Sequence, residues 1–243
     1  MKALQLTALL ILTVCPSARA FELPRVSRQC IVGVSEHWNS SKVTLTCYEK
    51  RGETWIKKHG PWPGRLGKNG SIWGRGLHPL KAGDAVKKEG DGRAPAGVFA
   101  IGGAWGYTSS IRKHPKLPYR QITPRDLWVE DADSPHYNHH LILDHLPATN
   151  WEKRQQMRQD DHAHSLKLFI AHNAPPHVIP GAGSAIFFHI WRDGGARPTA
   201  GCTTLSEDRL RTMIAWIDPG EQPLYVLLPS TIYQSKRSQW KLP

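Results

Sequence analysis

Cysteine is scarce in this chain, and long hydrophobic runs are absent. Four of the 243 residues are cysteine, so the fate of each can be considered individually. After the first twenty residues, no segment approaches the roughly 18 continuous apolar residues of a membrane-spanning helix, so no integral membrane span is expected. The chain also lacks internal repeats, low-complexity linkers and blocks of five or more like charges. These absences argue for one ordered domain whose charge is spread along the chain.

Acidic residues are also in short supply. The chain has 20 Asp and Glu against 32 Lys and Arg, which gives a formal net charge of +12. Such an excess of positive charge points to an anionic partner. The candidates are a nucleic acid, a membrane surface or an acidic polymer outside the cell. Hydrophobic residues make up 40% of the chain, which suffices for a packed core and excludes a disordered protein. Frequent Gly (21) and Pro (19) favour a turn-rich, strand-rich protein over a helical bundle.

The N-terminal sequence indicates which of these partners is expected. Lys2 precedes a short apolar run at 8–14, and the Ala-Arg-Ala sequence at 18–20 has the small-x-small pattern of a cleavage site. Residues 1–20 are therefore predicted to be a signal peptide, and the protein is expected in the periplasm or otherwise exported. Cleavage removes two positive charges and leaves +10. Export disfavours a nucleic-acid partner and favours docking to an acidic polymer.

Three cysteines remain after the predicted cleavage. Cys30 lies in an apolar stretch and Cys47 in an alternating one, and the turn-like sequence at 38–41 separates them. Folding about that turn would place Cys30 opposite Cys47 on adjacent strands. A disulfide between them is predicted, since the compartment is oxidising, and it would contribute roughly 3 kcal/mol. The alternative is two buried free thiols. Cys202 is then unpaired.

The rest of the chain predicts a mainly β fold with few helices. Strand-like runs separated by turn residues occur at 29–36, 42–50, 55–59, 97–101, 127–130, 166–172, 185–191 and 224–228. A helix is predicted at 151–160, with Asn150 as its N-cap. A second helix is predicted at 206–217. Its apolar face comprises Leu210, Met213, Ile214 and Ile217.

The segment 185–206 carries the candidate chemistry. His189 lies near the end of an apolar strand, and after a turn at 193–195 the chain returns to Cys202, just before the second helix. A helix N-terminus and a nearby imidazole both lower the pKa of a thiol. A thiolate activated by histidine is the minimum needed for acyl transfer through a thioester. The amides of Gly201 and Cys202 could form an oxyanion hole. The alternative is a buried cysteine beside a structural histidine.

This segment resembles the signature of the L,D-transpeptidase catalytic domain, the YkuD-type family. His189 is followed by Thr-Ala-Gly-Cys-Thr-Thr at 199–204, where the family has roughly Ser/Thr-His-Gly-Cys-x-Arg/Asn. The likeness extends to an ordered set of upstream segments, at 60–63, 67–70, 73–78, 87–97, 133–138 and 183–189. The resemblance implies a β-sandwich of mixed sheets with a helix after the catalytic cysteine. It also implies one catalytic domain over 21–243, with an N-terminal hairpin extension at about 25–59 and a core at about 60–229.

The family's functional residues carry over as follows. Cys202 matches the nucleophile, which attacks a carbonyl in a peptidoglycan stem peptide and expels the D-amino acid that follows. His189 matches the general base, and the backbone carbonyl of Ile190 matches the group that orients the imidazole. Gly201 matches the oxyanion segment. An acceptor amine of a second stem peptide then resolves the thioester into a cross-link. The resemblance also implies inhibition by carbapenems.

Two positions depart from the family pattern. Ala200 replaces a histidine, and Thr204 replaces an Arg or Asn that is a plausible carboxylate clamp. Either another cation serves or another donor substrate is used. Arg192 and Arg197 are the candidate cations and are predicted to bind substrate. The alternative is that both are solvated surface charges. Three threonines of the motif, Thr199, Thr203 and Thr204, are also predicted to contact substrate.

Other functions remain open at this stage. His-rich segments at 139–145 and 160–164 could suggest metal binding, but no strong ligand spacing is present, and neither a metal nor a cofactor is expected. The same Cys/His pair would also serve an L,D-carboxypeptidase or an amidase-type hydrolase, in which water resolves the thioester. The third interpretation is a basic wall-binding module with an inert Cys202.

Overall fold

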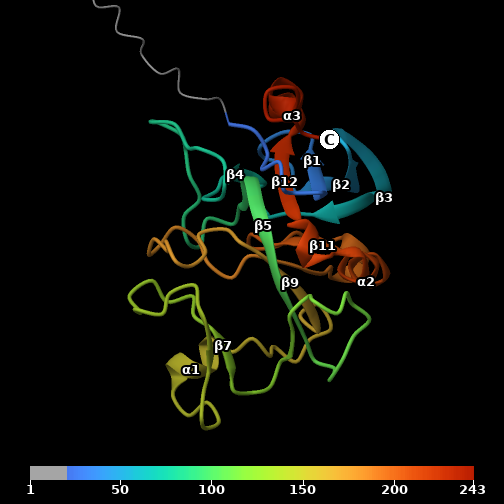
Figure 1. Ribbon diagram of the computed structural model, residues 1–243. Coiled ribbons are helices and arrows are strands. Elements are labelled where there is room, and N and C mark those ends of the chain that lie inside the picture. Colours follow the sequence, from blue (N-terminus) through green and yellow to red (C-terminus); the bar gives the residue numbers. More distant parts are fainter. Residues whose placement is uncertain (1–20) are drawn as a thin grey trace, which may run out of the picture.

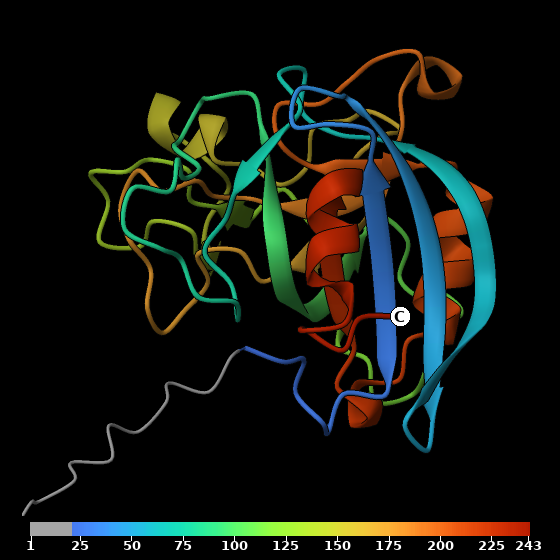
Figure 2. The same cartoon turned by 90° about the horizontal axis from the view of Figure 1, so that it is seen from above.

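The fold is a single mixed sheet that closes on itself, seen in a computed structural model that describes residues 21–243 (Figures 1 and 2). Its strands follow the order β12-β1-β2-β3-β11-β10-β9-β5, and β5 pairs back onto β12. β4 extends the sheet beyond β5, β6 pairs with β5, and β7 and β8 form a separate hairpin-like pair. The mainly β class predicted from sequence is confirmed. The predicted sandwich is corrected to a closed, barrel-like sheet.

The elements have the following bounds. The strands are β1 Gln29–Ser35, β2 Lys42–Arg51, β3 Thr54–Arg65, β4 Ser71–Trp73, β5 Ala94–Gly106, β6 Tyr119–Gln121, β7 Asp126–Trp128, β8 His140–Ile142, β9 Leu166–Ile170, β10 Phe187–Ile190, β11 Thr203–Leu205 and β12 Leu224–Pro229. The helices are α1 Asn150–Arg154, α2 Glu207–Trp216 and α3 Ser230–Arg237, with short 3₁₀ turns at Asp193–Gly195 and Pro219–Glu221. β1 and β2, within the segment expected as an N-terminal hairpin, are integral members of the closed sheet. The predicted signal peptide lies outside the described residues.

Apolar side chains pack on both faces of the sheet. One face, which includes Ile31, Leu45 and Phe188, forms the largest cluster together with α2. The apolar face predicted for α2 is buried as expected, with Leu210, Met213, Ile214 and Ile217 all inaccessible to solvent. The opposite face of β1, β5 and β12 packs beneath α3 and the C-terminal residues. A third cluster lies beside β9 and β10, where the long connections between 105 and 165 cover the sheet.

The predicted disulfide between Cys30 and Cys47 is corrected by the strand register. Both thiols are free. Cys47 pairs with Ile31 across the β1–β2 ladder, and Cys30 pairs with Tyr48. Because adjacent residues of a strand point to opposite faces, a one-residue offset sends the two thiols to different sides of the sheet. Cys47 accordingly belongs to the large interior cluster and Cys30 to the cluster under α3.

Both predicted helices are present. The helix predicted at 206–217 matches α2, whereas the helix predicted at 151–160 was too long. α1 stops at Arg154 rather than at 160, because Gln156 already bridges to Leu127 of β7. Its N-cap is Thr149, which forms a reciprocal capping box with Glu152. α3 was not predicted. None of its residues is fully buried, and its apolar contact with the sheet comes from two adjacent residues, Ile232 and Tyr233, which do not repeat at helical spacing.

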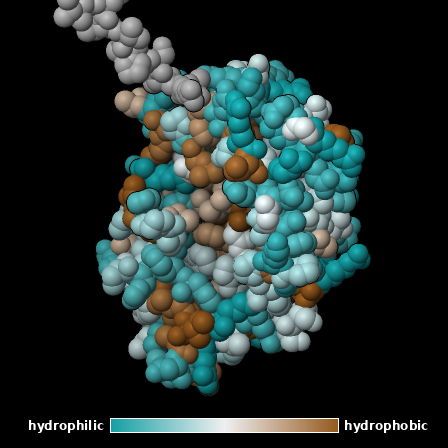
Figure 3. Space-filling view, in the orientation of Figure 1, coloured by the Kyte–Doolittle hydropathy of each residue, from teal (hydrophilic) through white to brown (hydrophobic). Residues whose placement is uncertain are grey.

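Figure 3 shows a face that is mostly hydrophilic, with apolar side chains in small scattered patches. Among residues 21–243, no helix combines the length and the apolar character needed to cross a membrane.

Candidate active site

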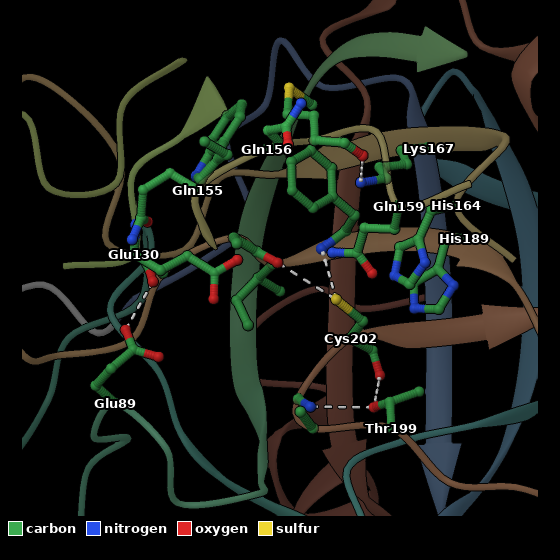
Figure 4. Close-up of a pocket in the computed structure, with 18 of the residues that line it drawn as sticks. Glu89, Glu130, Gln155, Gln156, Gln159, His164, Lys167, His189, Thr199 and Cys202 are labelled. Carbon is green, nitrogen blue, oxygen red and sulfur yellow. Dashed lines mark hydrogen bonds between the residues drawn. The ribbon is translucent and has the colours of Figure 1, made fainter. Parts of the chain in front are cut away.

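Cys202 lies where the chain enters β11, beside the start of β10. Its Sγ accepts a hydrogen bond from the Phe187 amide at 3.4 Å and donates one to the Ala185 carbonyl at 3.3 Å. The thiol is partly exposed and borders a cavity of about 270 Å³ (Figure 4). The backbone leading into β10 therefore fixes the position of the thiol.

His189 projects from β10 into the same cavity. Its Nδ1 lies 2.9 Å from the Ile190 carbonyl oxygen. Because a carbonyl only accepts, Nδ1 carries the proton in this contact and Nε2 is left as a free base. The His164 ring stacks on the His189 ring, with centroids 4.8 Å apart and planes 24° apart (Figure 4). The imidazole is thus held in one tautomer and one orientation.

Burial sets the protonation states of both groups. Burial, and then the neighbouring His164, lower the pKa of His189 to about 3. Burial raises the pKa of Cys202 to about 11, although the Phe187 amide and the Lys167 ammonium act in the opposite direction. At neutral pH the site therefore contains a thiol and a neutral imidazole, not a thiolate–imidazolium pair.

The predicted lowering of the thiol pKa by a helix N-terminus is wrong. α2 begins only at Glu207, and β11 separates it from Cys202. The dipole effect of a helix falls off within its first turn, so α2 cannot offset the loss of water around the sulfur.

The cavity draws side chains from several separate parts of the chain. Its polar lining residues are Lys87, Glu89, Glu130, Gln155, Gln156, Gln159, His164, Lys167, Ser184, His189, Arg192, Thr199 and Cys202. Figure 4 shows the histidines and Lys167 on one side of Cys202, with Glu89 and Glu130 on the other. The site is therefore divided into a basic side and an acidic side.

Comparison with known proteins gives the family. The family model of the YkuD L,D-transpeptidase catalytic domain matches residues 39–226, most of the chain. The chain belongs to this family. No curated protein matches it. Among solved structures, the helical cell shape determining protein Pgp2 from Campylobacter jejuni is similar, with 13% identity and a TM-score of 0.36. That match covers 87% of this chain and 51% of the other, so the chain spans about half the length of that protein.

In this member of the L,D-transpeptidase family, Thr199 braces the loop that carries Cys202. Its Oγ1 donates to the Cys202 carbonyl at 2.7 Å and accepts from the Gly201 amide at 3.1 Å. Gly201 is tightly enclosed, because a Cβ there would lie 3.0 Å from the Arg93 carbonyl oxygen. Both residues, singled out by the motif, thus shape the backbone on either side of the sulfur.

Three of the five predicted substrate-binding residues do not line the cavity. Thr203 is buried and its hydroxyl contacts that of Tyr225 at 3.1 Å. Thr204 is buried, and its hydroxyl has no partner among residues 21–243. Arg197 is exposed and pairs with Asp193. Thr203 faces the core, Thr204 is buried on the strand beside His189, and Arg197 faces solvent, so the structure does not place these three side chains in the cavity.

The remaining predicted cation, Arg192, does line the cavity. Its guanidinium is paired with Asp161 at 2.5 Å. Asp161 also accepts from His164 at 2.8 Å, so it joins the arginine to the ring that stacks on His189. Arg192 therefore contributes to an ion pair at the rim.

Lys167 is a cavity residue that the motif did not reveal. It lies in β9 directly opposite His189 of β10. It is 5% exposed, and burial lowers its pKa to about 8. The signal in the sequence was a single cation inside the apolar run Leu-Lys-Leu-Phe-Ile at 166–170. Its relation to His189 depends on sheet pairing, which a local motif does not encode.

The acidic side of the cavity was also missed. Removal of water, and then the nearby Glu89, raise the pKa of Glu130 to about 7. Glu89 itself accepts hydrogen bonds from the Tyr137 and Ser184 hydroxyls. Glu130 follows β7 and Glu89 lies in the loop before β5, so only the folded chain brings these carboxyl groups together.

Histidines of the two histidine-rich segments form hydrogen bonds with carboxylates. His140 contacts Asp126 at 2.8 Å, and His145 contacts Asp144 at 2.6 Å. Across residues 21–243, no group of three or more His, Cys, Asp or Glu side chains is placed to hold a metal ion.

Proposed function

We propose that the protein is an exported L,D-transpeptidase that cross-links peptidoglycan stem peptides through a thioester on Cys202. The observation that carries the proposal is that Cys202 and a neutral, oriented His189 line one cavity. Membership of the L,D-transpeptidase family supports the substrate class. A hydrolase with the same Cys/His pair is the competing outcome of the test below.

In the first half-reaction, substrate binding brings a peptide carbonyl to the sulfur. The Cys202 proton passes to Nε2 of His189 as the S–C bond forms, which gives a tetrahedral oxyanion. When that intermediate collapses, the C–N bond breaks and His189 returns the proton to the leaving amine. The raised pKa of Cys202 and the neutral imidazole fit a proton transfer that accompanies attack rather than precedes it.

In the second half-reaction, the amine of an acceptor stem peptide attacks the thioester. His189 takes the proton from the attacking nitrogen, the C–S bond breaks, and the sulfur recovers a proton from the imidazolium. The product is a peptide cross-link, and the enzyme returns to its starting state. If water replaces the amine, the same steps release a shortened peptide.

The backbone amide of Cys202 is the donor best placed to stabilise the oxyanion. The Gly201 amide is already bonded to the Thr199 hydroxyl, whereas the Cys202 amide adjoins the reacting sulfur. A backbone donor in this place acts at the developing charge without having to reorient. The net positive charge of the chain supports the proposal in a different way, because stem peptides carry carboxylates that a basic protein attracts.

Incubation with muropeptides tests this function. The purified protein and its Cys202→Ala variant are mixed with stem tetrapeptides, and the products are identified by mass. Release of D-alanine together with dimers is the expected result. Release of D-alanine without dimers would identify a carboxypeptidase. Equal conversion by the Cys202→Ala protein would exclude the thioester mechanism.

A further inference from the structure

Lys167 is a buried cation with unused hydrogen-bonding capacity. An ammonium group has three donors, and Lys167 Nζ donates to one acceptor, the Met157 carbonyl oxygen, at 3.0 Å (Figure 4). Phe187 lies beneath it, with the ring centroid 5.7 Å from Nζ. Glu130 and Asp161 influence it electrostatically, but within residues 21–243 no carboxylate lies within 4.0 Å. Burying a charge without a counterion is costly, which points to a partner that arrives from outside.

The other cations at this cavity are already neutralised. Lys87 pairs with Asp91 at 2.7 Å, and Arg192 pairs with Asp161. Thr204, the position where the family pattern has an Arg or Asn, carries no charge and is buried. Lys167 is therefore the cavity cation that has no carboxylate within ion-pair distance in the described part of the chain.

Sheet register places this cation next to the general base. Lys167 of β9 and His189 of β10 are direct cross-strand partners, so their side chains leave the sheet on the same face. Thr204 of β11 is the partner of His189 on its other side. Neighbouring strands lie roughly 4.8 Å apart, so the three positions form a short row across the sheet with the imidazole at its centre.

We propose that Lys167 binds the α-carboxylate of the residue that leaves during acylation. The inference rests on the proposed function. His189 must protonate the leaving nitrogen, so that nitrogen lies at the imidazole. The α-carboxylate is attached one carbon from the same nitrogen, which brings it to the side of the histidine where Lys167 lies. The cation thereby selects substrates that end directly after the attacked bond.

Binding to an inactive protein tests the proposal without turnover. The Cys202→Ala protein is titrated by calorimetry with a stem tetrapeptide that ends in D-alanine and with the same peptide as its C-terminal amide. A charge-assisted hydrogen bond predicts that the free acid binds about 10- to 100-fold more tightly than the amide. Adding Lys167→Met, which keeps an unbranched apolar side chain and removes the charge, should make the two dissociation constants equal.

Two further variants distinguish carboxylate binding by Lys167 from a purely structural role of this residue. Lys167→Arg keeps the charge and should retain a preference for the free acid. Lys116→Met removes one charge from an exposed loop and should leave the preference unchanged. Thermal unfolding of each variant checks its folding. Equal binding of acid and amide by the Cys202→Ala protein, or a preference that survives Lys167→Met, overturns the proposal. A third outcome separates the two proposals. If binding prefers the free acid through Lys167 but the wild-type protein forms no cross-links, the proposed function is wrong and the role of Lys167 stands.

Discussion

The molecule contains cysteines in two contrasting regions, the β1–β2 wall and the β10–β11 edge of the cavity. Cys30 and Cys47 are fully buried among apolar side chains, and burial raises the pKa of each thiol well above its ordinary value. Cys202 is partly exposed, and burial raises its pKa to about 11. These pKa values make all three cysteines thiols at neutral pH, so protonation state does not distinguish Cys202 from Cys30 and Cys47.

What separates the two regions is the set of polar groups around the sulfur. Cys202 accepts from a backbone amide, shares a cavity with His189, and lies near the Lys167 ammonium. In the wall, the contact found for Cys30 is a weak one to the adjacent Ile31 carbonyl. Under the proposed function, the reactivity of Cys202 depends on a base and a substrate that meet in one cavity, more than on a permanently ionised sulfur.

The largest effect should follow from removing the reactive thiol. Cys202→Ala is expected to abolish cross-linking, because no other group in the cavity can form the thioester. A carbapenem should add its mass to the wild-type protein and not to this variant, as measured by intact-protein mass spectrometry. Cys47→Ala provides the matched control and should still form the adduct. An adduct on the Cys202→Ala protein would place the reactive group elsewhere.

Removal of the base should have the next largest effect. His189→Gln is expected to slow acylation by about 10²–10⁴-fold, the usual contribution of a positioned general base. The rate is measured as the appearance of the acyl-enzyme mass after mixing with the tetrapeptide. Because His189 is buried, thermal unfolding must show that the variant is folded. A folded variant with an unchanged rate would contradict the assigned role.

Alkylation across a pH range sharpens the contrast between the regions. Below its pKa, the thiolate fraction of Cys202 rises about tenfold per pH unit, so iodoacetamide labelling should accelerate by about 100-fold between pH 7 and 9. The increase should continue toward the pKa of about 11. Cys30 and Cys47 should react only after unfolding, as shown by peptide mapping. A labelling rate that is already constant at pH 7 would mean that the free protein holds a thiolate.

The smallest effect is expected from substituting a cysteine in the β1–β2 wall. Cys47→Ala leaves a gap of about one sulfur atom in a packed interior and should lower the free energy of unfolding by about 1–2 kcal/mol. Urea titration measures this change. Because Cys30 and Cys47 are not bonded, a reducing agent should leave the wild-type midpoint unchanged. A loss of about 3 kcal/mol on reduction would instead reveal a disulfide.

Local pattern was enough to find the two central residues and the α2 helix. Cys202 and His189 were found because both lie in one short segment, and α2 because its apolar face repeats at helical spacing. Lys167 was missed because its link to His189 runs through the β9–β10 pairing, between residues that are distant in the chain. Glu130 and Glu89 were missed for the same reason.

The disulfide prediction failed at the level of register. Both strands and the turn between them were correctly located, since β1 and β2 pair as an antiparallel hairpin. A difference of one residue in the pairing nevertheless decides which face each thiol occupies. The closure of the sheet could not be predicted from local sequence patterns either, because it depends on the pairing of β12 with β1 and β5, which are distant from it in the chain.

That closure sets an order for assembly during synthesis. β12, at Leu224–Pro229, completes the ring by pairing with both β1 and β5, and Tyr225 within it contacts Thr203, the residue after the nucleophile. The segment that carries Cys202 is made before β12, so the ring around it is still open when the thiol emerges. Non-local strand pairing of this kind is slow to form. The sheet around Cys202 can therefore close only after β12 has been made.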